Sequence, residues 1–311
     1  MNMAYFISIL STVILPIFLL IGAGYFVQRI FHFDLNALQK VIFYLLIPAL
    51  IFFRLYNTTL SFRSFSSLFL FEVALIVIMG LISIPVSRLR KYSPSMRAAF
   101  ALALMYCNSG NYGIPVIELV FNNNPAANSI QVLVLTAQNI LTFSLGVFLI
   151  SRSSYSFKDS IGKMLKFPTL YAIVLAVLLR ILHIPVWTPL WIPIEWLARA
   201  LVPIALISLG ASLAKITITT GLTDVCMAVF GRLILGPLIA LALIFIFQYR
   251  GIMAHTLLIA SSMPTAVNTA LLAMEFENEP RFASQTVLFT TILSILTVSF
   301  SIYFGSLLFG N

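Results

Sequence analysis

The sequence NSGNYGIP, residues 108–115, interrupts an apolar run that extends from residue 94 to residue 121. In a helix interior, glycine costs about 1 kcal/mol and proline about 3 kcal/mol, and proline also removes a backbone donor. A regular helix through this stretch is therefore energetically unfavourable. A second interruption, SSMPTAVN at residues 261–268, lies inside the apolar run 252–274. These two breaks are the basis of the predicted fold.

The composition makes lipid the solvent of this chain. Of its 311 residues, 61% are hydrophobic and 9% are charged, and the mean hydropathy is +1.06. A soluble domain carries about 45–50% apolar and about 25% charged residues, so this chain has too few polar side chains to cover a surface in water. In hydrocarbon, a broken helix persists only where it is buried in protein or lines a wet cavity.

The apolar runs predict an all-α integral membrane protein with ten transmembrane helices and no sizeable soluble domain, because a span needs about 20 predominantly apolar residues. No basic residue precedes the run from Phe6 to Val27, and no small-residue cleavage site follows it. We interpret this run as a first span and not as a signal peptide. The predicted helices are 4–28, 36–56, 66–87, 94–121, 129–151, 166–183, 193–214, 222–248, 252–274 and 281–309.

The basic residues predict the orientation. The net charge is +9, and since cytoplasmic loops of membrane proteins collect Lys and Arg, this charge needs no nucleic-acid partner. With both termini outside the cell membrane, twelve basic residues face the cytoplasm and five face the other side. The twelve are Arg29, Lys40, Arg88, Arg90, Lys91, Arg97, Arg152, Lys158, Lys163, Lys166, Lys215 and Arg281, and the five are Arg54, Arg63, Arg180, Arg199 and Arg250.

The sequence contains no pattern of catalytic or metal-binding residues. Cys107 and Cys226 lie in apolar stretches and have no metal-ligand spacing, so we expect both to be buried and structural. The three histidines, His32, His183 and His255, fall near predicted helix ends. His255 stands at the opening of the ninth helix, and we expect it to be a loop residue and not a proton relay. We therefore predict no enzyme activity, no cofactor and no bound metal.

The two halves of the chain resemble each other. A shift of 155 residues places Pro48 on Pro203 and Pro125 on Pro280, and a shift of 157 places Asn111 on Asn268. These matches predict two five-helix repeats, residues 1–155 and 156–311. Because five is odd, the second repeat must enter the membrane from the opposite side. Inverted repeats are a common plan of secondary transporters, whose binding sites lie near the midplane between the repeats.

The two breaks predict a binding site. Crossed breaks would point the N-termini of two half-helices, with free N–H groups and positive dipole ends, at one place. A carboxylate accepts hydrogen bonds from such groups and from asparagine amides, so we predict Asn111 and Asn268 as paired anchors for a small organic anion. The other predicted substrate-binding residues are Asn108, Ser109, Gly110, Gly113, Pro115, Ser262, Pro264, Thr265, Ser208 and Gly210. The alternative is two kinked helices whose asparagines only bridge to neighbouring helices.

The segments 111–115, 208–214 and 264–268 resemble the auxin efflux carrier family, and the whole chain is similar to its bacterial members labelled malate or malonate permeases. Tyr44 and Pro48 in the second helix belong to the same likeness. The resemblance implies a scaffold domain, a mobile transport domain built on crossed fourth and ninth helices, an elevator-type movement and a homodimer. This chain lacks the large cytoplasmic loop of the long plant carriers, so regulation by that loop is not implied.

Several other polar residues at membrane depth are candidates for function. Glu72 or Glu118 is predicted to carry a coupling proton, although Glu118 could equally lie in water at the end of its half-helix. Ser208 and Gly210 either line the cavity or allow close helix packing. Arg232 in the eighth helix could balance a substrate charge, but we expect its side chain to extend to a membrane interface. In the fifth helix Gln131, Gln138 and Thr142 form a polar stripe, with Asn139 beside them.

Alternative functions follow from the same features. A sodium-coupled organic anion symporter of the bile-acid type shares the crossed-helix plan. Sodium sites usually include a carboxylate, and neither break contains Asp or Glu, which favours proton coupling or uniport. A channel or a receptor that does not transport is a weaker hypothesis, and saturable counterflow would exclude a simple channel.

Overall fold

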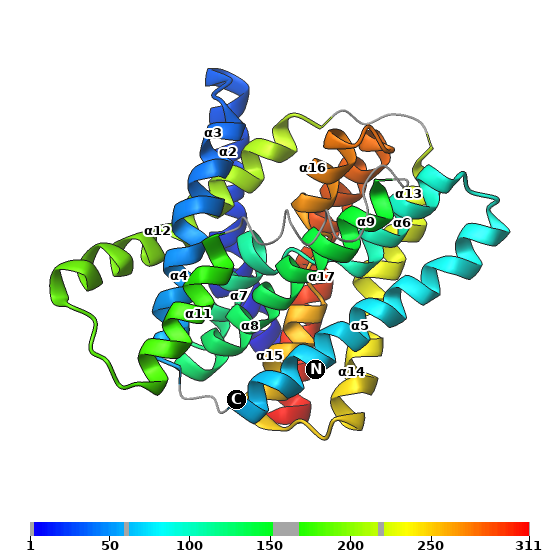
Figure 1. Ribbon diagram of the computed structural model, residues 1–311. Helices are drawn as coiled ribbons and strands as arrows, with labels where there is room; N and C mark the ends of the chain where they lie inside the picture. The colour runs from blue at the N-terminus through cyan, green and yellow to red at the C-terminus, as the bar shows by residue number, and fades with distance from the viewer. Residues whose placement is uncertain (1–2, 59–61, 152–167, 217–220, 311) are drawn as a thin grey trace.

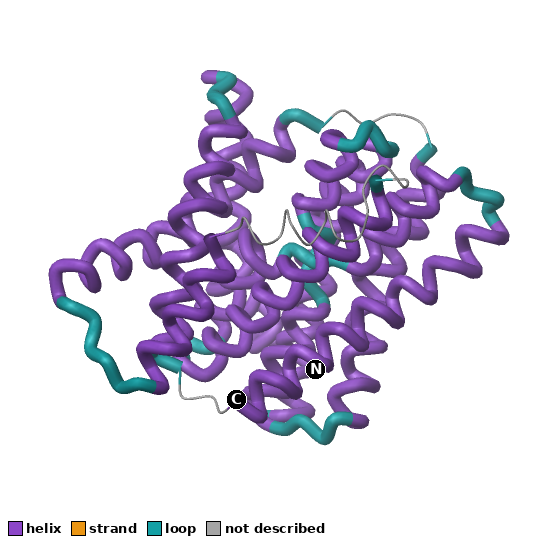
Figure 2. Tube along the Cα trace, in the orientation of Figure 1, coloured by secondary structure: helices purple, strands orange, loops and turns teal. Residues whose placement is uncertain are grey.

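A computed structural model describes residues 3–58, 62–151, 168–216 and 221–310. Within these ranges every regular element is a helix, as predicted (Figure 1), and Figure 2 shows short loop segments among the helices at the middle of the bundle. Four basic residues used to predict the orientation, Arg152, Lys158, Lys163 and Lys166, lie outside the described residues.

In the first half the helical stretches follow the predicted segments, and the fourth segment is divided. The elements are α1 (Met3–Ile9), η1 (Leu10–Ile14), α2 (Leu15–Phe31), α3 (Leu35–Val41), η2 (Ile42–Leu46), α4 (Ile47–Tyr56), α5 (Phe62–Leu89), α6 (Pro94–Met105), η3 (Ser109–Gly113), α7 (Ile114–Val120), α8 (Pro125–Leu141), η4 (Thr142–Gly146) and α9 (Val147–Ile150).

In the second half the ninth predicted segment is divided at its expected place. The elements are α11 (Pro168–Ile181), α12 (Thr188–Ala214), α13 (Leu222–Phe230), η5 (Gly231–Leu235), α14 (Gly236–Ile246), α15 (Gly251–Ser261), α16 (Val267–Glu275) and α17 (Pro280–Phe309).

The η elements are π-helical turns, which are wider than α-helical turns. Four of them end two residues before a proline, namely Pro16, Pro48, Pro115 and Pro237. A proline ring clashes with the carbonyl four residues earlier and cannot donate a hydrogen bond. A wider turn moves that carbonyl away, so these prolines are accommodated with little interruption of the helical stretch.

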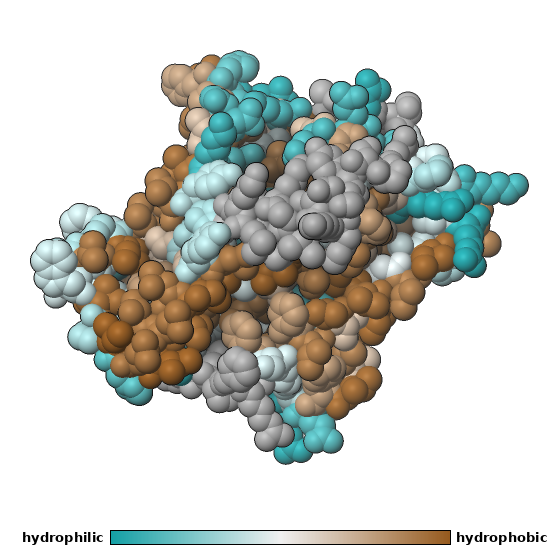
Figure 3. All heavy atoms as spheres, viewed as in Figure 1, coloured by the Kyte–Doolittle hydropathy of each residue, from teal (hydrophilic) through white to brown (hydrophobic). Residues whose placement is uncertain are grey.

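The outer surface suits a lipid bilayer. Seven helical stretches of the described chain are long and apolar enough to span a membrane, and three shorter apolar helices are Pro94–Met105, Pro168–Ile181 and Gly251–Ser261. On the face shown in Figure 3, hydrophobic residues cover the middle and hydrophilic residues gather at the two ends. This distribution is expected of a protein that crosses a membrane several times.

The helices pack in two groups. In the first, here called the α12 group, α12 packs along α2 and α4, and α11 packs against α4. In the second, the crossing group, α5 packs on α6 and α8, and α15 packs on α8, α14 and α17.

Gly210 of α12 lies directly against the backbone of Ile21, and Gly24 of α2 lies against the backbone of Ile207. Any side chain at either glycine would collide with backbone, so Gly210 serves close helix packing.

The two ends of the chain lie on the same side of the molecule (Figure 1). Tyr5 of α1 contacts Tyr303 of α17, with ring centroids 5.8 Å apart, and Phe6 contacts Phe300 at 5.2 Å. Opposite chain ends that meet on one side require an even number of membrane crossings.

An ion pair ties the turn after α5 to α13. Asp224, in the first turn of α13, accepts a hydrogen bond from Arg90 Nε at 3.1 Å and one from the Tyr92 hydroxyl at 2.8 Å. Burial, and then the hydrogen bond to Asp224, raises the pKa of Tyr92 to about 12. Tyr92 therefore remains a neutral donor at physiological pH.

Candidate functional site

The two breaks lie side by side at the centre of the crossing group. Cys107 and Thr265 pair as antiparallel neighbours, Asn108 N–H donates to Pro264 O at 2.8 Å, and Ala266 N–H donates to Tyr106 O at 3.1 Å. The backbone groups released by each break are thus partly satisfied by the other break, as burial in an apolar interior requires. Residues 108–115 and 261–268 meet as predicted.

Side chains reinforce the crossing. The Thr265 hydroxyl is buried and donates to Ala103 O at 3.0 Å, which links the second break to the end of α6. Gln131 of α8 donates to Ser109 O at 2.7 Å. The Gln131 amide occupies the space that a side chain at Gly113 would need, so glycine at 113 allows this contact.

Arg232 joins both breaks, and the expectation that it extends to a membrane interface is wrong. Its side chain is 1% exposed. Nη1 donates to Leu104 O at 3.0 Å, Nε donates to Met263 O at 3.1 Å, and Nη2 donates to Ser261 O. These carbonyls lie at the C-terminal ends of α6 and α15, where helices carry unpaired acceptors and partial negative charge. Arg232 stays inside because the breaks supply the acceptors that it would otherwise find in water.

A small cavity, here called the crossing cavity, adjoins the two breaks. Its volume of about 20 Å³ leaves room for about one water molecule. Its polar lining comprises Asn108, Ser109, Asn111, Gln138, Asn139, Thr142 and Asn268, and its apolar lining includes Phe43, Ile47, Leu135 and Val267. None of the described residues that line it is charged at neutral pH.

Hydrogen-bond donors converge on this cavity. The Asn108 amide nitrogen is buried without a partner. Within the described chain the side chains of Asn111, Asn139 and Asn268 also form no hydrogen bond. η3 and α16 both begin at the break without a side-chain cap. The first N–H groups of a helix lack partners in that helix and carry partial positive charge. The cavity therefore offers amide donors and positive dipole ends, which suits an anion.

The predicted substrate-binding residues divide into two sets. Asn108, Ser109, Gly110, Asn111 and Asn268 line the crossing cavity. Gly113, Pro115, Ser262, Pro264 and Thr265 build the crossing but are absent from that lining. Ser208 and Gly210 are buried in α12, and they are also absent from it.

Glu72 is connected to the cavity through one glutamine. Its carboxyl is 3% exposed and accepts a hydrogen bond from Gln138 Nε2 at 3.0 Å. Gln138 Oε1 in turn accepts from Cys107 N–H at 3.4 Å, at the crossing itself. A change at Glu72 can thus be relayed to the cavity wall by a single side chain.

Glu118 and His255 occupy other environments. Glu118 lies on α7, which packs on α8 of the crossing group. It forms a half-buried ion pair with Arg54 of α4 and so links the crossing group to the α12 group. The expectation that His255 is a loop residue is wrong. His255 lies on α15, is fully buried, and has Nε2 3.1 Å from Ile302 O. It fits there because Gly305 of α17 leaves room for its ring.

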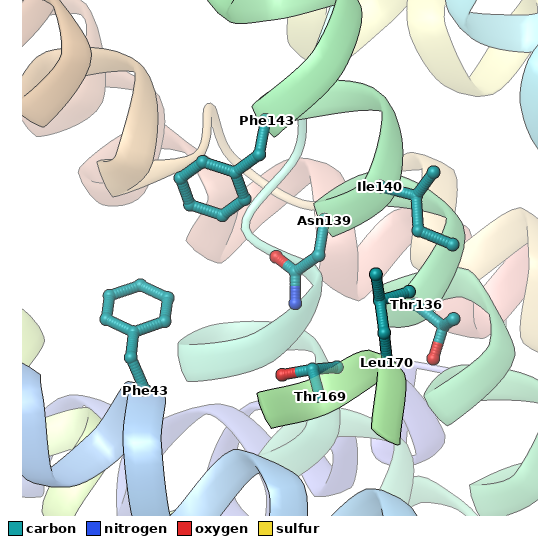
Figure 4. A pocket seen from close by; sticks show the side chains of 7 residues that line it. All are labelled: Phe43, Thr136, Asn139, Ile140, Phe143, Thr169 and Leu170. Atoms are coloured by element: carbon teal, nitrogen blue, oxygen red, sulfur yellow. The ribbon is translucent and has the colours of Figure 1, made fainter. Parts of the chain in front are cut away.

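A larger hollow, here called the vestibule, opens beside the crossing cavity. It has a volume of about 330 Å³ and is lined by Lys40, Phe43, Phe143, Asn268 and Glu275, among others. Asn268 and Phe43 line both spaces. Phe43 and Phe143 contact each other edge to face, with centroids 6.4 Å apart. Figure 4 shows a smaller neighbouring pocket that these two rings also line, with the Asn139 amide directed into it.

Sequence reasoning missed Phe43 and gave Asn139 too little weight. Phe43 lies in an apolar helix that contains several other aromatic residues, so no local signal distinguishes it. Asn139 is a polar residue at membrane depth, as Asn111 is, and that signal would have sufficed.

Comparisons with known proteins place the chain among membrane transporters. The model of a family described as membrane transport protein matches residues 9–302. An uncharacterized transporter of Methanothermobacter thermautotrophicus is 27% identical over 85% of this chain and 87% of its own. An uncharacterized transporter of Methanocaldococcus jannaschii is 26% identical over 92% of this chain and 96% of its own. A proposed malonate transporter of Rhizobium meliloti is 27% identical over 94% of this chain and 95% of its own.

Proposed function

The chain belongs to the membrane transport protein family, that of the auxin efflux carriers, and from this we propose that it carries small carboxylates across the cell membrane by alternating access. The observation that carries the proposal is the crossing cavity, where asparagine amides and two helix starts meet without a charged side chain. Oriented amides bind a carboxylate well when they need not first be released from other partners. Malonate, malate and auxin-like acids are the substrates to test.

We propose ten spans arranged as two inverted repeats, with the α12 group as scaffold and the crossing group as the moving part of an elevator. The seven long and three short apolar helices, the chain ends on one side and the two packing groups support this arrangement. Lys40 and Glu275 at the vestibule belong to connections predicted to be cytoplasmic. The vestibule would therefore face the cytoplasm, with both termini outside, and a homodimer would hold the scaffold still.

We propose a proton as the coupling ion, carried by Glu72. A buried carboxyl next to the crossing is a functional candidate because an ionised group at that depth is costly, and Gln138 joins it to the cavity. The alternative is a sodium-coupled symporter of the bile-acid type. No carboxylate lines the crossing cavity within the described residues, whereas sodium prefers oxygen ligands that include one.

Counterflow in proteoliposomes tests the function. Vesicles loaded with unlabelled malonate, malate or indole-acetate are diluted into a trace of the same labelled acid. We expect a saturable, transient accumulation with at least one acid, and none with a neutral sugar of similar size. Accumulation with no carboxylate, or flux that never saturates, would contradict a carboxylate carrier.

Replacing Glu72 by glutamine tests the coupling. Glutamine preserves a hydrogen-bonding side chain of the same size but cannot release a proton. We expect uptake driven by a pH gradient to fall to the rate measured without a gradient, while counterflow stays near the wild-type rate. Glu118→Gln is the matched control and should keep the response to the gradient. A Glu72→Gln protein that still responds to the gradient, or a wild-type protein that responds only to sodium, would assign the coupling elsewhere.

A further inference from the structure

A further cavity lies beside α11, away from the crossing. This α11 groove has a volume of about 560 Å³, within the usual range of small-molecule sites. Its wall is mainly apolar and includes Leu55, Leu133, Val174, Val177 and Leu178. Val174 is 57% exposed and Leu178 is 49% exposed, and Figure 3 shows a continuous hydrophobic surface over this part of the molecule. The groove therefore opens to lipid.

The polar lining of the groove lies at one end. It consists of Thr58, just after α4, Arg180 in the last turn of α11, and His183 just beyond α11. The Tyr56 hydroxyl donates to Ile184 O at 3.1 Å, which places the ends of α4 and α11 next to each other. The groove thus combines an apolar body at membrane depth with a cationic and hydrogen-bonding rim at the membrane surface.

We propose that the α11 groove is a binding site for an anionic phospholipid, whose acyl chain fills the apolar body and whose phosphate lies at Arg180 and His183. A Lys or Arg side chain close to an anionic headgroup contributes about 1 kcal/mol to its binding. A neutral detergent or a sterol matches the apolar wall but not the charge at the rim. Both packing groups contribute to the wall, Leu55 and Val177 from the α12 group and Phe65 and Leu133 from the crossing group.

Native mass spectrometry of the full, delipidated chain tests this site without relying on transport. The protein is incubated with equal amounts of phosphatidylglycerol and phosphatidylcholine that carry the same acyl chains. We expect about fivefold more bound phosphatidylglycerol, the preference expected from one basic residue near the headgroup. Equal retention of the two lipids by the wild-type protein would overturn the proposal.

Two kinds of variant locate the site. Arg180→Gln should bring the ratio of the two lipids close to one, whereas Arg199→Gln, at an exposed arginine of α12 paired with Glu195, should leave it unchanged. Val177→Trp should lower the retention of both lipids by filling the groove, and Val174→Phe does the same from the exposed lip if the first variant fails to fold. Retention unaffected by every groove variant would overturn the proposal, as would a dimer that separates when the groove is filled, because a second copy would then be the occupant.

If the proposed elevator movement is correct, a lipid in contact with both groups also affects its rate. Counterflow should then differ between phosphatidylglycerol and phosphatidylcholine vesicles for the wild-type protein and not for Arg180→Gln. This part rests on the proposed function. Lipid selectivity without any carboxylate flux would contradict the proposed function but would still support the lipid site.

Discussion

Replacing Asn111 or Asn268 by alanine is expected to reduce carboxylate counterflow by about tenfold to a hundredfold while the protein stays folded. Each amide would donate to a charged acceptor, and such a hydrogen bond contributes about 1.5–3 kcal/mol. Both side chains line the crossing cavity and form no hydrogen bond within the described chain. Their removal therefore leaves no partner unsatisfied and should lower the melting temperature little.

Cys107 provides a readout of the same site that is independent of transport. It lines the crossing cavity and is 4% exposed, as expected. The expectation that Cys226 is also buried is wrong, because its side chain is exposed, and the chain has no other cysteine. In a Cys226→Ser background, a transported acid should slow alkylation of Cys107, and Asn111→Ala or Asn268→Ala should abolish this protection. Asn57→Ala, at an exposed asparagine at the end of α4, is the control. Near-normal counterflow and protection in both alanine variants would leave the asparagines as bridges only.

Replacing Arg232 is expected to have the largest effect on stability. Arg232→Leu removes three hydrogen bonds to buried carbonyls and leaves both half-helix ends uncompensated. Leaving a buried acceptor without its partner costs about 1–3 kcal/mol, and this variant leaves three, so we expect little folded protein and rapid alkylation of Cys107. Arg232→Lys keeps the charge but loses the planar fork that reaches several acceptors. It should fold with a lower melting temperature and intermediate alkylation.

Arg199 provides a matched control for Arg232. Arg199→Leu removes an exposed arginine with a single partner on its own helix, and an exposed pair of this kind contributes at most about 1 kcal/mol. Its melting temperature should stay within a few degrees of the wild-type value. If Arg232→Leu melted at the same temperature as Arg199→Leu, Arg232 would not hold the breaks together.

Some features were predictable because their causes are local. The cost of proline and glycine inside a helix depends on a few neighbouring residues, so the breaks at 108–115 and 261–268 could be located before any contact was known. The pairing of the breaks followed from the repeat together with the need to satisfy backbone groups away from water. Asn111 and Asn268 were identified because polar residues stand out in an apolar run.

Other features could not be predicted because almost every helix is apolar on all sides. In a soluble helix the hydrophobic stripe marks the buried face, but in lipid an apolar side chain can face either the bilayer or the protein. Nothing in the sequence around Phe43 therefore indicates that it borders both the vestibule and the crossing cavity. For the same reason, nothing in the sequence indicates the α11 groove.

The sequence by itself determined that lipid is the solvent, where two spans break and which amides are available at the breaks, because composition and backbone strain are properties of short stretches. Only the tertiary structure decided the place of Arg232, of His255 and of the aromatic pair Phe43–Phe143. Their positions depend on acceptors and on space supplied by distant segments, such as the carbonyls of Leu104 and Met263 and the gap at Gly305. A buried polar side chain lies where its partners are, and those partners meet only when the chain folds.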